Sequence, residues 1–361
     1  MGEVAHFRPP GSAADEVRVM LVDDSAVMRG FLRRVLEHET RIRIVGSASN
    51  GEDALRQLHS VQPDVVILDL EMPVMDGITA LPLLLSARPG LRILIASVLS
   101  QRNAAISLEA MRLGASDYLA KPERAFAPEV AKAYGDDLAA RILALSRKAE
   151  APRAAVPAPP IPTRRRAGVA ARPEILAIGS STGGPPALMK VFEGLKGVDL
   201  PILITQHMPP TFTALLATSL GRLTGRPSAE AEDGEPILPG RIYVAPAGLH
   251  LTVARIGARV VVKLSDAPPE NYCRPAVDPM LRSLAAAYGP GVFAAILTGM
   301  GSDGAKGCEA VAEAGGRFIA QDEKTSVVWG MPGAAARTGR ADAILPLLDI
   351  APFIASVCRV P

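Results

Sequence analysis

Short apolar runs alternate along the chain with longer stretches in which apolar residues recur every three or four positions. The apolar runs cover residues 17–22, 65–68, 91–96, 175–178, 201–205 and 292–297. Helical spacing follows the first run at Met28, Phe31 and Leu32, and the fourth run at Leu188 and Val191. Strand-like runs that alternate with amphipathic helices predict an α/β fold with largely parallel sheets.

The alternation stops between residues 148 and 173, where Ala, Pro and Arg dominate and no apolar period remains. Such a composition is typical of an extended linker. We therefore predict a doubly wound parallel-sheet domain over residues 16–147 and a second α/β domain, with a mostly parallel sheet, over residues 174–361. Residues 1–15 are predicted to be an N-terminal extension. The basic run 164–166 could attract an acidic surface, although a solvated linker is the favoured interpretation.

Composition narrows the classes of function. The formal net charge is +2, so overall electrostatics do not indicate a nucleic-acid partner. No apolar run is long enough to span a bilayer, and the N-terminus lacks the apolar core of a signal peptide. The three scattered cysteines, Cys273, Cys308 and Cys358, fit neither a disulfide framework nor a zinc site. We expect a cytoplasmic protein that does not insert into membranes.

Charged and polar side chains stand at the ends of the predicted strands of the first domain. Asp23 and Asp24 follow one strand, Asp69 ends the next, Ser97 follows a third, and Lys121 follows a fourth. Polar groups at the carboxyl ends of parallel strands gather at one edge of a sheet. Clustered carboxylates repel unless a cation lies among them, and oxygen ligands suit Mg²⁺. Mg²⁺ and Lys121 could together neutralise an aspartyl phosphate. The alternative is that the aspartates are helix N-caps.

The fourth apolar run leads into a serine- and glycine-rich turn. Ser180 and Ser181 are followed by Gly183, Gly184 and Pro185, an order that predicts a strand, a tight turn and a helix with proline at its first position. Backbone N–H groups at a helix N-terminus can stabilise an oxyanion, so the turn is a suitable place for a nucleophilic serine. The alternative is an ordinary glycine-rich turn, or one that holds a phosphate.

Two histidines follow the linker, which limits the candidates for a general base. His207 comes directly after a predicted strand, whereas His250 lies between turn residues and an alternating segment, which favours a structural role. Asp303 follows the run 292–297 within a glycine-rich loop and could accept the second imidazole N–H. Its alternative role is a helix N-cap. The chain order of serine, histidine and aspartate differs from that of α/β-hydrolases, chymotrypsin and subtilisin.

The first domain resembles a response-regulator receiver domain. The resemblance rests on the acidic pair 23–24, the loop 69–77 with sequence DLEMPVMDG, and the Lys-Pro pair 121–122. It implies that Asp69 is the phosphoacceptor and that a histidine kinase is the phosphodonor. The implied Mg²⁺ ligands are Asp24, Asp69 and the Glu71 carbonyl, with Asp23 acting through water. The implied switch residues are Ser97, Tyr118 and Lys121.

The second domain resembles the chemotaxis protein-glutamate methylesterase family, CheB. The matching motifs are residues 180–184, 206–209, 274–278, 297–305 and 330–332. The resemblance implies Ser181 as nucleophile, His207 as base and Asp303 as its orienting residue. It implies that Thr182 and the Met300 backbone N–H support the transition state. Ser180 stands where the family often has alanine, so it is a second hydroxyl that needs separate testing. Ala276 stands where serine is common, with no functional consequence assigned.

The resemblance implies a phosphorylation-regulated hydrolase that demethylates glutamate methyl esters on methyl-accepting chemotaxis receptors and deamidates receptor glutamines. The implied partners are these receptors and a chemotaxis histidine kinase, and the serine chemistry itself is expected to need no cofactor. One rival is a response regulator whose second domain only binds a partner. Another is a DNA-binding regulator, which is weaker because no basic recognition helix follows the linker.

Overall fold

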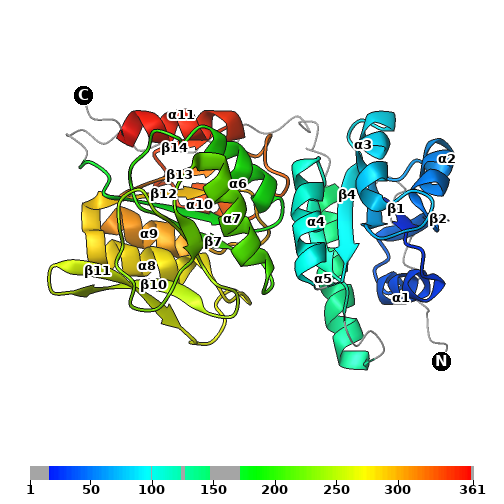
Figure 1. The fold of residues 1–361 in the computed structure, drawn as a ribbon, viewed down its shortest axis with the longest axis horizontal. Coiled ribbons are helices and arrows are strands. Elements are labelled where there is room, and N and C mark those ends of the chain that lie inside the picture. The colour runs from blue at the N-terminus through cyan, green and yellow to red at the C-terminus, as the bar shows by residue number, and fades with distance from the viewer. Residues whose placement is uncertain (1–15, 99, 123–126, 147–170, 359–361) are drawn as a thin grey trace, which may run out of the picture. The chain divides into compact units, whose positions relative to one another are not determined.

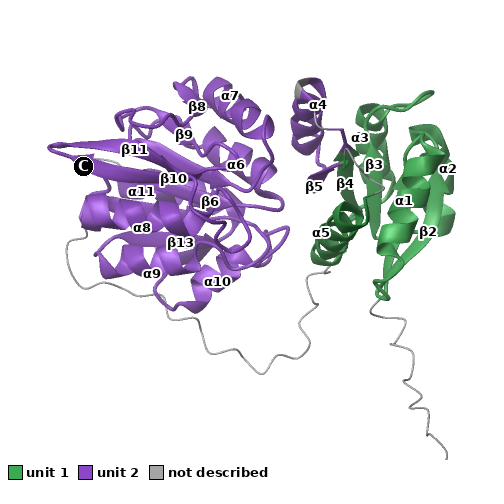
Figure 2. Ribbon diagram, turned by 90° about the horizontal axis from the view of Figure 1, so that it is seen from below, with its two compact units in different colours: residues 1–96, 121–146 green, residues 97–120, 147–361 purple. Residues whose placement is uncertain are grey.

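The computed structural model describes residues 16–98, 100–122, 127–146 and 171–358 (Figure 1). The described residues form two compact units, coloured separately in Figure 2: one lies within residues 16–96 and 121–146, and the other within residues 97–120 and 171–358. The predicted N-terminal extension, most of the predicted linker and the basic run 164–166 lie outside the described residues. Within the described ranges, no helix has both the length and the apolar character needed to cross a membrane.

The first sheet contains five strands in the order β2-β1-β3-β4-β5. The pairs β1–β2, β1–β3 and β3–β4 are parallel, as predicted for a doubly wound domain. The strands are β1 (Val17–Val22), β2 (Ile42–Ala48), β3 (Val65–Asp69), β4 (Arg92–Ser97) and β5 (Asp117–Ala120). The helices are α1 (Ala26–Leu36), α2 (Gly51–Val61), α3 (Gly77–Ala87), α4 (Gln101–Arg112) and α5 (Pro128–Ser146).

Side-chain caps fix the starts of the helices next to the acidic strand ends. The Ser25 side chain accepts the Met28 N–H and caps α1, and the Asp76 side chain accepts the Thr79 N–H and caps α3. These two caps leave Asp23, Asp24 and Asp69 outside the N-cap positions. The alternative interpretation of the three aspartates as helix caps is therefore wrong.

The second sheet contains seven strands in the order β14-β13-β12-β6-β7-β9-β8, and all its pairs are parallel. A separate antiparallel hairpin joins β10 and β11. The prediction of a mostly parallel sheet is confirmed. The strands are β6 (Ile175–Ser180), β7 (Ile202–Gln206), β8 (Ser228–Glu230), β9 (Ile242–Val244), β10 (His250–Ile256), β11 (Arg259–Ser265), β12 (Val292–Ile296), β13 (Arg317–Gln321) and β14 (Ala343–Leu345).

The helices of this part of the chain are α6 (Gly184–Glu193), α7 (Phe212–Thr224), α8 (Val277–Tyr288), α9 (Ala305–Glu313), α10 (Met331–Arg337) and α11 (Leu347–Cys358). One apolar cluster includes Met280 and Leu281 of α8, Ile296 of β12 and Cys308 of α9, all fully buried. Burial of this apolar surface fixes α8 and α9 against the sheet. The N-termini of these two helices consequently have defined positions near the strand ends.

Candidate active site

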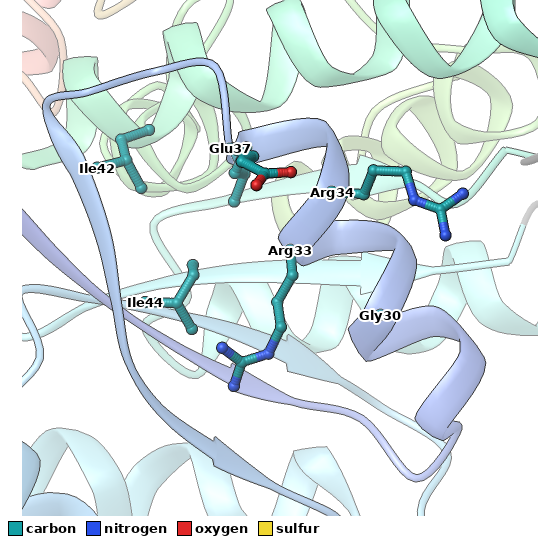
Figure 3. A pocket seen from close by; sticks show the side chains of 7 residues that line it. Gly30, Arg33, Arg34, Glu37, Ile42 and Ile44 are labelled. Carbon is teal, nitrogen blue, oxygen red and sulfur yellow. The ribbon is translucent and has the colours of Figure 1, made fainter.

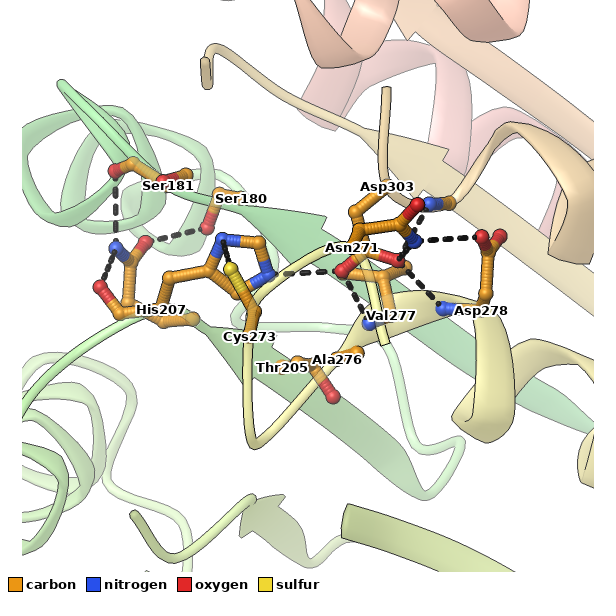
Figure 4. A network of polar contacts seen from close by, with 12 residues as sticks. Ser180, Ser181, Thr205, His207, Asn271, Cys273, Ala276, Val277, Asp278 and Asp303 are labelled. Carbon is orange, nitrogen blue, oxygen red and sulfur yellow. Dashed lines mark hydrogen bonds and ion pairs between the residues drawn. The ribbon is translucent and has the colours of Figure 1, made fainter. Parts of the chain in front are cut away.

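Three neighbouring strands bring the predicted site residues of the second domain together. β12, β6 and β7 are adjacent, with Ile296 opposite Gly179 and Ser180 opposite Gln206. Beyond these ends, the His207 N–H donates to the Ser180 carbonyl at 3.1 Å. The residues that follow the three strands therefore meet at one edge of the sheet, where Figure 4 shows Ser181, His207 and Asp303.

The turn after β6 depends on glycine. α6 begins at Gly184, so Pro185 is its second residue rather than its first, and the cap Gly183 has a φ of 73°. That φ suits glycine because it carries no Cβ. A Cβ on Gly299, in the loop after β12, would lie 2.9 Å from the Ser181 Cβ. The absence of side chains here lets two loops approach the serine closely.

The structure distinguishes the two adjacent serines. Ser180 is fully buried and its hydroxyl donates to Gln206 Oε1 at 2.6 Å. The Gln206 amide in turn donates to the carbonyl oxygens of Ser181, at 2.9 Å, and His207, at 3.2 Å. Ser180 and Gln206 therefore brace the two strand ends, whereas Ser181 is half-buried and lies at the tip.

Asp303 is bonded to the imidazole of His207. Its Oδ2 lies 2.8 Å from His207 Nε2 and accepts the Val277 N–H at 2.6 Å. Its Oδ1 accepts the N–H groups of Asp278 and Gly304, both at 3.0 Å. Val277 and Asp278 form the first turn of α8, whose dipole favours a negative charge at this end. A buried carboxylate with this many donors is held in one orientation.

The two groups shift each other's pKa. Burial acts to raise the pKa of Asp303, but the hydrogen bond from His207 and the backbone N–H groups outweigh it, so this pKa is lowered. Burial acts to lower the pKa of His207, but the contacts with Asp303 and Cys273 outweigh it and raise this pKa to about 9. The geometry therefore favours an ionised Asp303 beside an imidazole that readily takes up a proton.

His250 has a different environment. Its Nδ1 accepts the Ala276 N–H at 3.1 Å, so its Nε2 carries the proton and donates to the Pro268 carbonyl at 3.1 Å. The side chain is buried at the start of β10. Both ring nitrogens are thus committed to the backbone, which supports a structural role for His250 and leaves His207 as the candidate base.

The predicted transition-state residues lie in the loops that follow β6 and β12. The Thr182 carbonyl accepts the Thr298 hydroxyl at 2.9 Å, and the same hydroxyl accepts the Val328 N–H at 2.9 Å. Within the described ranges, no hydrogen bond occupies the backbone N–H of Thr182 or Met300. Two loops tied together by Thr298 therefore leave these N–H groups available to an oxyanion.

Sequence reasoning missed several members of this network. The Asn271 amide donates to Asp303 Oδ1 at 2.9 Å and to Asp278 Oδ2 at 3.0 Å, and Cys273 Sγ lies 3.4 Å from His207 Nδ1 (Figure 4). The sequence indicates Gln206 only as part of a family motif, and it indicates residues 274–278 without a role. A signal was present at Asn271, since asparagine tolerates the left-handed backbone of a tight turn.

In the first domain, the structure brings the predicted acidic cluster together. Ligand oxygens of Asp23, Asp24 and Asp69 all lie within 4.8 Å of one another. Lys121 Nζ lies 2.7 Å from Asp23 Oδ2 and 2.9 Å from Asp69 Oδ2. Burial raises the pKa of Asp69 despite the opposing effect of Lys121. Clustered carboxylate oxygens form the donor set that Mg²⁺ prefers, so these residues fit the predicted ion.

The remaining predicted receiver residues lie near strand ends. Glu71 is two residues beyond the end of β3. Ser97 is buried at the end of β4 and shares a hydrogen bond of 2.9 Å with Ser107. Tyr118 is buried in β5.

A separate open hollow of about 420 Å³ lies between α1 and β2 (Figure 3). Its lining contains Gly30, Arg33, Arg34, Leu36, Glu37, Ile42 and Ile44, and includes none of the predicted site residues.

Comparison with known proteins agrees with both domain assignments. Residues 176–354 match the CheB methylesterase family, and residues 19–127 match the response regulator receiver domain. The catalytic domain of Thermotoga maritima CheB methylesterase, as a crystal structure, is 41% identical with a TM-score of 0.50. That match covers 52% of this chain and 100% of the other.

Some relatives match this chain over almost its whole length. A protein of Paramagnetospirillum magneticum named protein-glutamate methylesterase/protein-glutamine glutaminase 1 is 50% identical, covering 96% of this chain and 97% of its own. A protein of Azospirillum brasilense named protein-glutamate methylesterase/protein-glutamine glutaminase is 48% identical, covering 96% and 94%. The chain belongs to the CheB family of protein-glutamate methylesterases, with a response-regulator receiver domain preceding the methylesterase domain.

Proposed function

We propose that the chain hydrolyses glutamate methyl esters on methyl-accepting chemotaxis receptors, and deamidates receptor glutamines, with Ser181 as nucleophile, His207 as base and Asp303 as its orienting residue. The observation that carries this proposal is the 2.8 Å contact between His207 Nε2 and Asp303 Oδ2, at the strand edge that also presents Ser181. The names of the full-length relatives describe the same two activities.

The contact supports different tasks for the two imidazole nitrogens. An ionised carboxylate only accepts hydrogen bonds, so Nε2 carries the proton in the neutral ring and Nδ1 has the lone pair that can accept another. Nδ1 is therefore the atom that takes the proton from Ser181 as its oxygen attacks the ester carbonyl. Asp303 stabilises the imidazolium that results.

The rest of the reaction follows the usual acyl-enzyme sequence. The backbone N–H groups of Thr182 and Met300 stabilise the oxyanion of the tetrahedral intermediate. The imidazolium returns its proton to the leaving group, so methanol departs and a serine ester remains. Water then hydrolyses that ester with His207 again as base. A glutamine substrate follows the same path with ammonia as the leaving group. These steps transfer the acyl group from substrate to Ser181 and then to water, with proton transfers through His207, and they use no cofactor.

The receiver domain controls this activity through Asp69, which accepts a phosphoryl group from a chemotaxis histidine kinase. Carboxylates of Asp24 and Asp69 and the Glu71 carbonyl would hold Mg²⁺, with Asp23 acting through water. A bound Mg²⁺ would neutralise negative charge on the phosphoryl oxygens. Lys121, already in contact with Asp69, adds a fixed positive charge.

The phosphoryl group adds roughly −1.5 to −2 charges at pH 7, which biases the positions of Ser97 and Tyr118. We place the enzyme in the cytoplasm, where it acts on receptors in their arrays.

Receptor demethylation with and without a small phosphodonor tests the proposal. The full chain should release methanol from methylated receptor, and the phosphodonor should accelerate release. The rival, a second domain that only binds a partner, predicts binding of receptor without methanol release under either condition. A preparation that takes up phosphate on Asp69 and releases no methanol would favour that rival.

A further inference from the structure

A second side chain contacts the catalytic base. Cys273 Sγ lies 3.4 Å from His207 Nδ1, while Nε2 of the same ring bonds Asp303. Nδ1 is the nitrogen that the proposed mechanism requires for the proton of Ser181. Among the residues that the structure describes, no hydrogen bond links the Ser181 hydroxyl to His207. The base nitrogen is thus occupied by sulfur rather than by the nucleophile.

The thiol is held in place by a tight turn. The Cys273 N–H donates to the Glu270 carbonyl at 2.9 Å, and the Glu270 N–H donates to the Cys273 carbonyl at 3.1 Å. The two residues between them, Asn271 and Tyr272, have φ values of 53° and 63°. Positive φ is uncommon for asparagine and an outlier for a bulky residue such as tyrosine. A backbone held in this region persists only where its surroundings fix it.

Contacts on both sides fix this turn relative to the triad. The Glu270 carboxylate forms two hydrogen bonds with the Arg282 guanidinium on α8, at 2.7 and 2.6 Å. The Asn271 amide bridges Asp278 and Asp303. This four-residue turn therefore contacts both sides of the imidazole: Asn271 bonds the carboxylate of Asp303, and Cys273 contacts Nδ1. The place of Cys273 is set by the same contacts that set Asp303.

We propose that Cys273 is a positioning residue for the hydrolase: its sulfur occupies Nδ1 of His207 and must release that nitrogen before Ser181 can transfer its proton. This inference rests on the proposed roles of Ser181 and His207. A ring nitrogen binds one proton in the ring plane, so sulfur and the serine hydroxyl compete for it. Between turnovers, Cys273 thereby keeps Nδ1 of His207 from accepting the proton of Ser181.

The charges around the ring support a shared proton. Among the described residues, the titratable groups that contact His207 are Asp303 and Cys273, and Asn271 links Asp303 to Asp278. When the proton passes from Sγ to Nδ1, the products are a thiolate and an imidazolium, and their opposite charges attract. Removing the sulfur removes one cause of the raised His207 pKa.

The pH profile of methyl ester hydrolysis by the full chain tests the inference. Cys273→Ala should shift the acid limb, the part of the pH–rate profile where the rate falls with falling pH, to lower pH by about half a unit to one unit. A shift of this size corresponds to the free energy of one hydrogen bond. Below the limb the rate follows the fraction of neutral imidazole, so the rate at pH 7 should rise roughly three- to tenfold. Cys358→Ser, on α11, should match the wild type. If Cys273→Ala does not fold, Cys273→Val serves, since valine fills the space of the thiol and offers Nδ1 no hydrogen-bonding atom. An unshifted limb would overturn the inference.

A second measurement needs no esterase activity. In Ser181→Ala, iodoacetamide alkylates Cys273 as a new S–C bond forms, the C–I bond breaks and iodide leaves, while His207 keeps the proton. Peptide mass spectrometry should show several-fold slower alkylation of Cys273 at pH 7 when His207→Gln is added. Equal rates would refute the pairing of sulfur and imidazole. Full esterase activity in Ser181→Ala would refute the proposed nucleophile instead, so the two failures are distinguishable.

Discussion

Asp303→Asn is the substitution with the most sharply defined consequence. The Asp303 carboxylate is almost fully buried and accepts the imidazole Nε2–H and the Val277 N–H on Oδ2. Its other oxygen accepts Asn271 and two further backbone N–H groups. An amide offers one oxygen and one NH₂ group. With its oxygen facing Asn271, the amide would point NH₂ at His207 and at the Val277 N–H.

Two effects follow when an NH₂ donor replaces the acceptor oxygen that faces His207 and Val277. The amide donates to Nε2, so the neutral ring must carry its proton on Nδ1, which then cannot accept the proton of Ser181. In a serine protease the same wrong tautomer reduces kcat by about 10⁴, and we expect a loss of about 10³ to 10⁴. The Val277 N–H also loses its acceptor, which costs about 1–3 kcal/mol of folding free energy.

Methanol release from methylated receptor measures the first effect, and thermal or urea unfolding measures the second. Asn271→Ala is the matched control because it removes one donor and keeps the carboxylate. We expect it to lower kcat by less than about tenfold, or 1.4 kcal/mol. A kcat within tenfold of the wild type for folded Asp303→Asn would refute the assignment of Asp303 as the orienting residue.

The further predictions concern pH, phosphorylation and metal. Because the pKa of His207 is raised to about 9, the hydrolysis rate should climb tenfold per pH unit up to about pH 9; a rate already constant above pH 7 would contradict this. The same raised pKa contributes stability that is fully present below about pH 6.5 and lost as pH rises through about 9, and His207→Gln should remove that slope in unfolding experiments. We predict that the unphosphorylated receiver inhibits the hydrolase, so Asp69→Asn should stay near the basal rate when a phosphodonor is present. The fragment from Pro173 onward should exceed the unphosphorylated full chain, and a well-folded fragment that is no faster would argue against simple inhibition. Chelation of divalent cations should abolish phosphorylation of Asp69 while leaving ester hydrolysis by that fragment unchanged, and a parallel loss of both would place a metal in the esterase chemistry.

Much of the fold and of the site was predictable because both depend on strand ends. Periodicity locates the strands, and parallel order brings their carboxyl ends to one edge, so Ser181, His207 and Asp303 could be nominated together. Asp23, Asp24 and Asp69 meet for the same reason. These inferences need no knowledge of loop conformation.

The supporting contacts could not be predicted, since they depend on register and loop geometry. The pairing of Ser180 with Gln206 across β6 and β7, which supports Ser181 rather than Ser180 as the nucleophile, depends on strand register. The contact between Cys273 and His207 spans 66 positions in sequence and depends on a turn with two residues at positive φ. Local propensity does not specify either arrangement.

The most direct test of the central claim compares Ser181→Ala with Ser180→Ala in methanol release from methylated receptor by the full, phosphorylated chain. Ser181→Ala should abolish release while Asp69 still accepts phosphate, because the proposed nucleophile and the proposed phosphoacceptor lie in separate domains. Ser180→Ala should retain the activity of Ser181, reduced only as far as loss of the Gln206 contact loosens the strand ends. Robust release by Ser181→Ala, together with loss of release in Ser180→Ala, would contradict the account and transfer the role to Ser180.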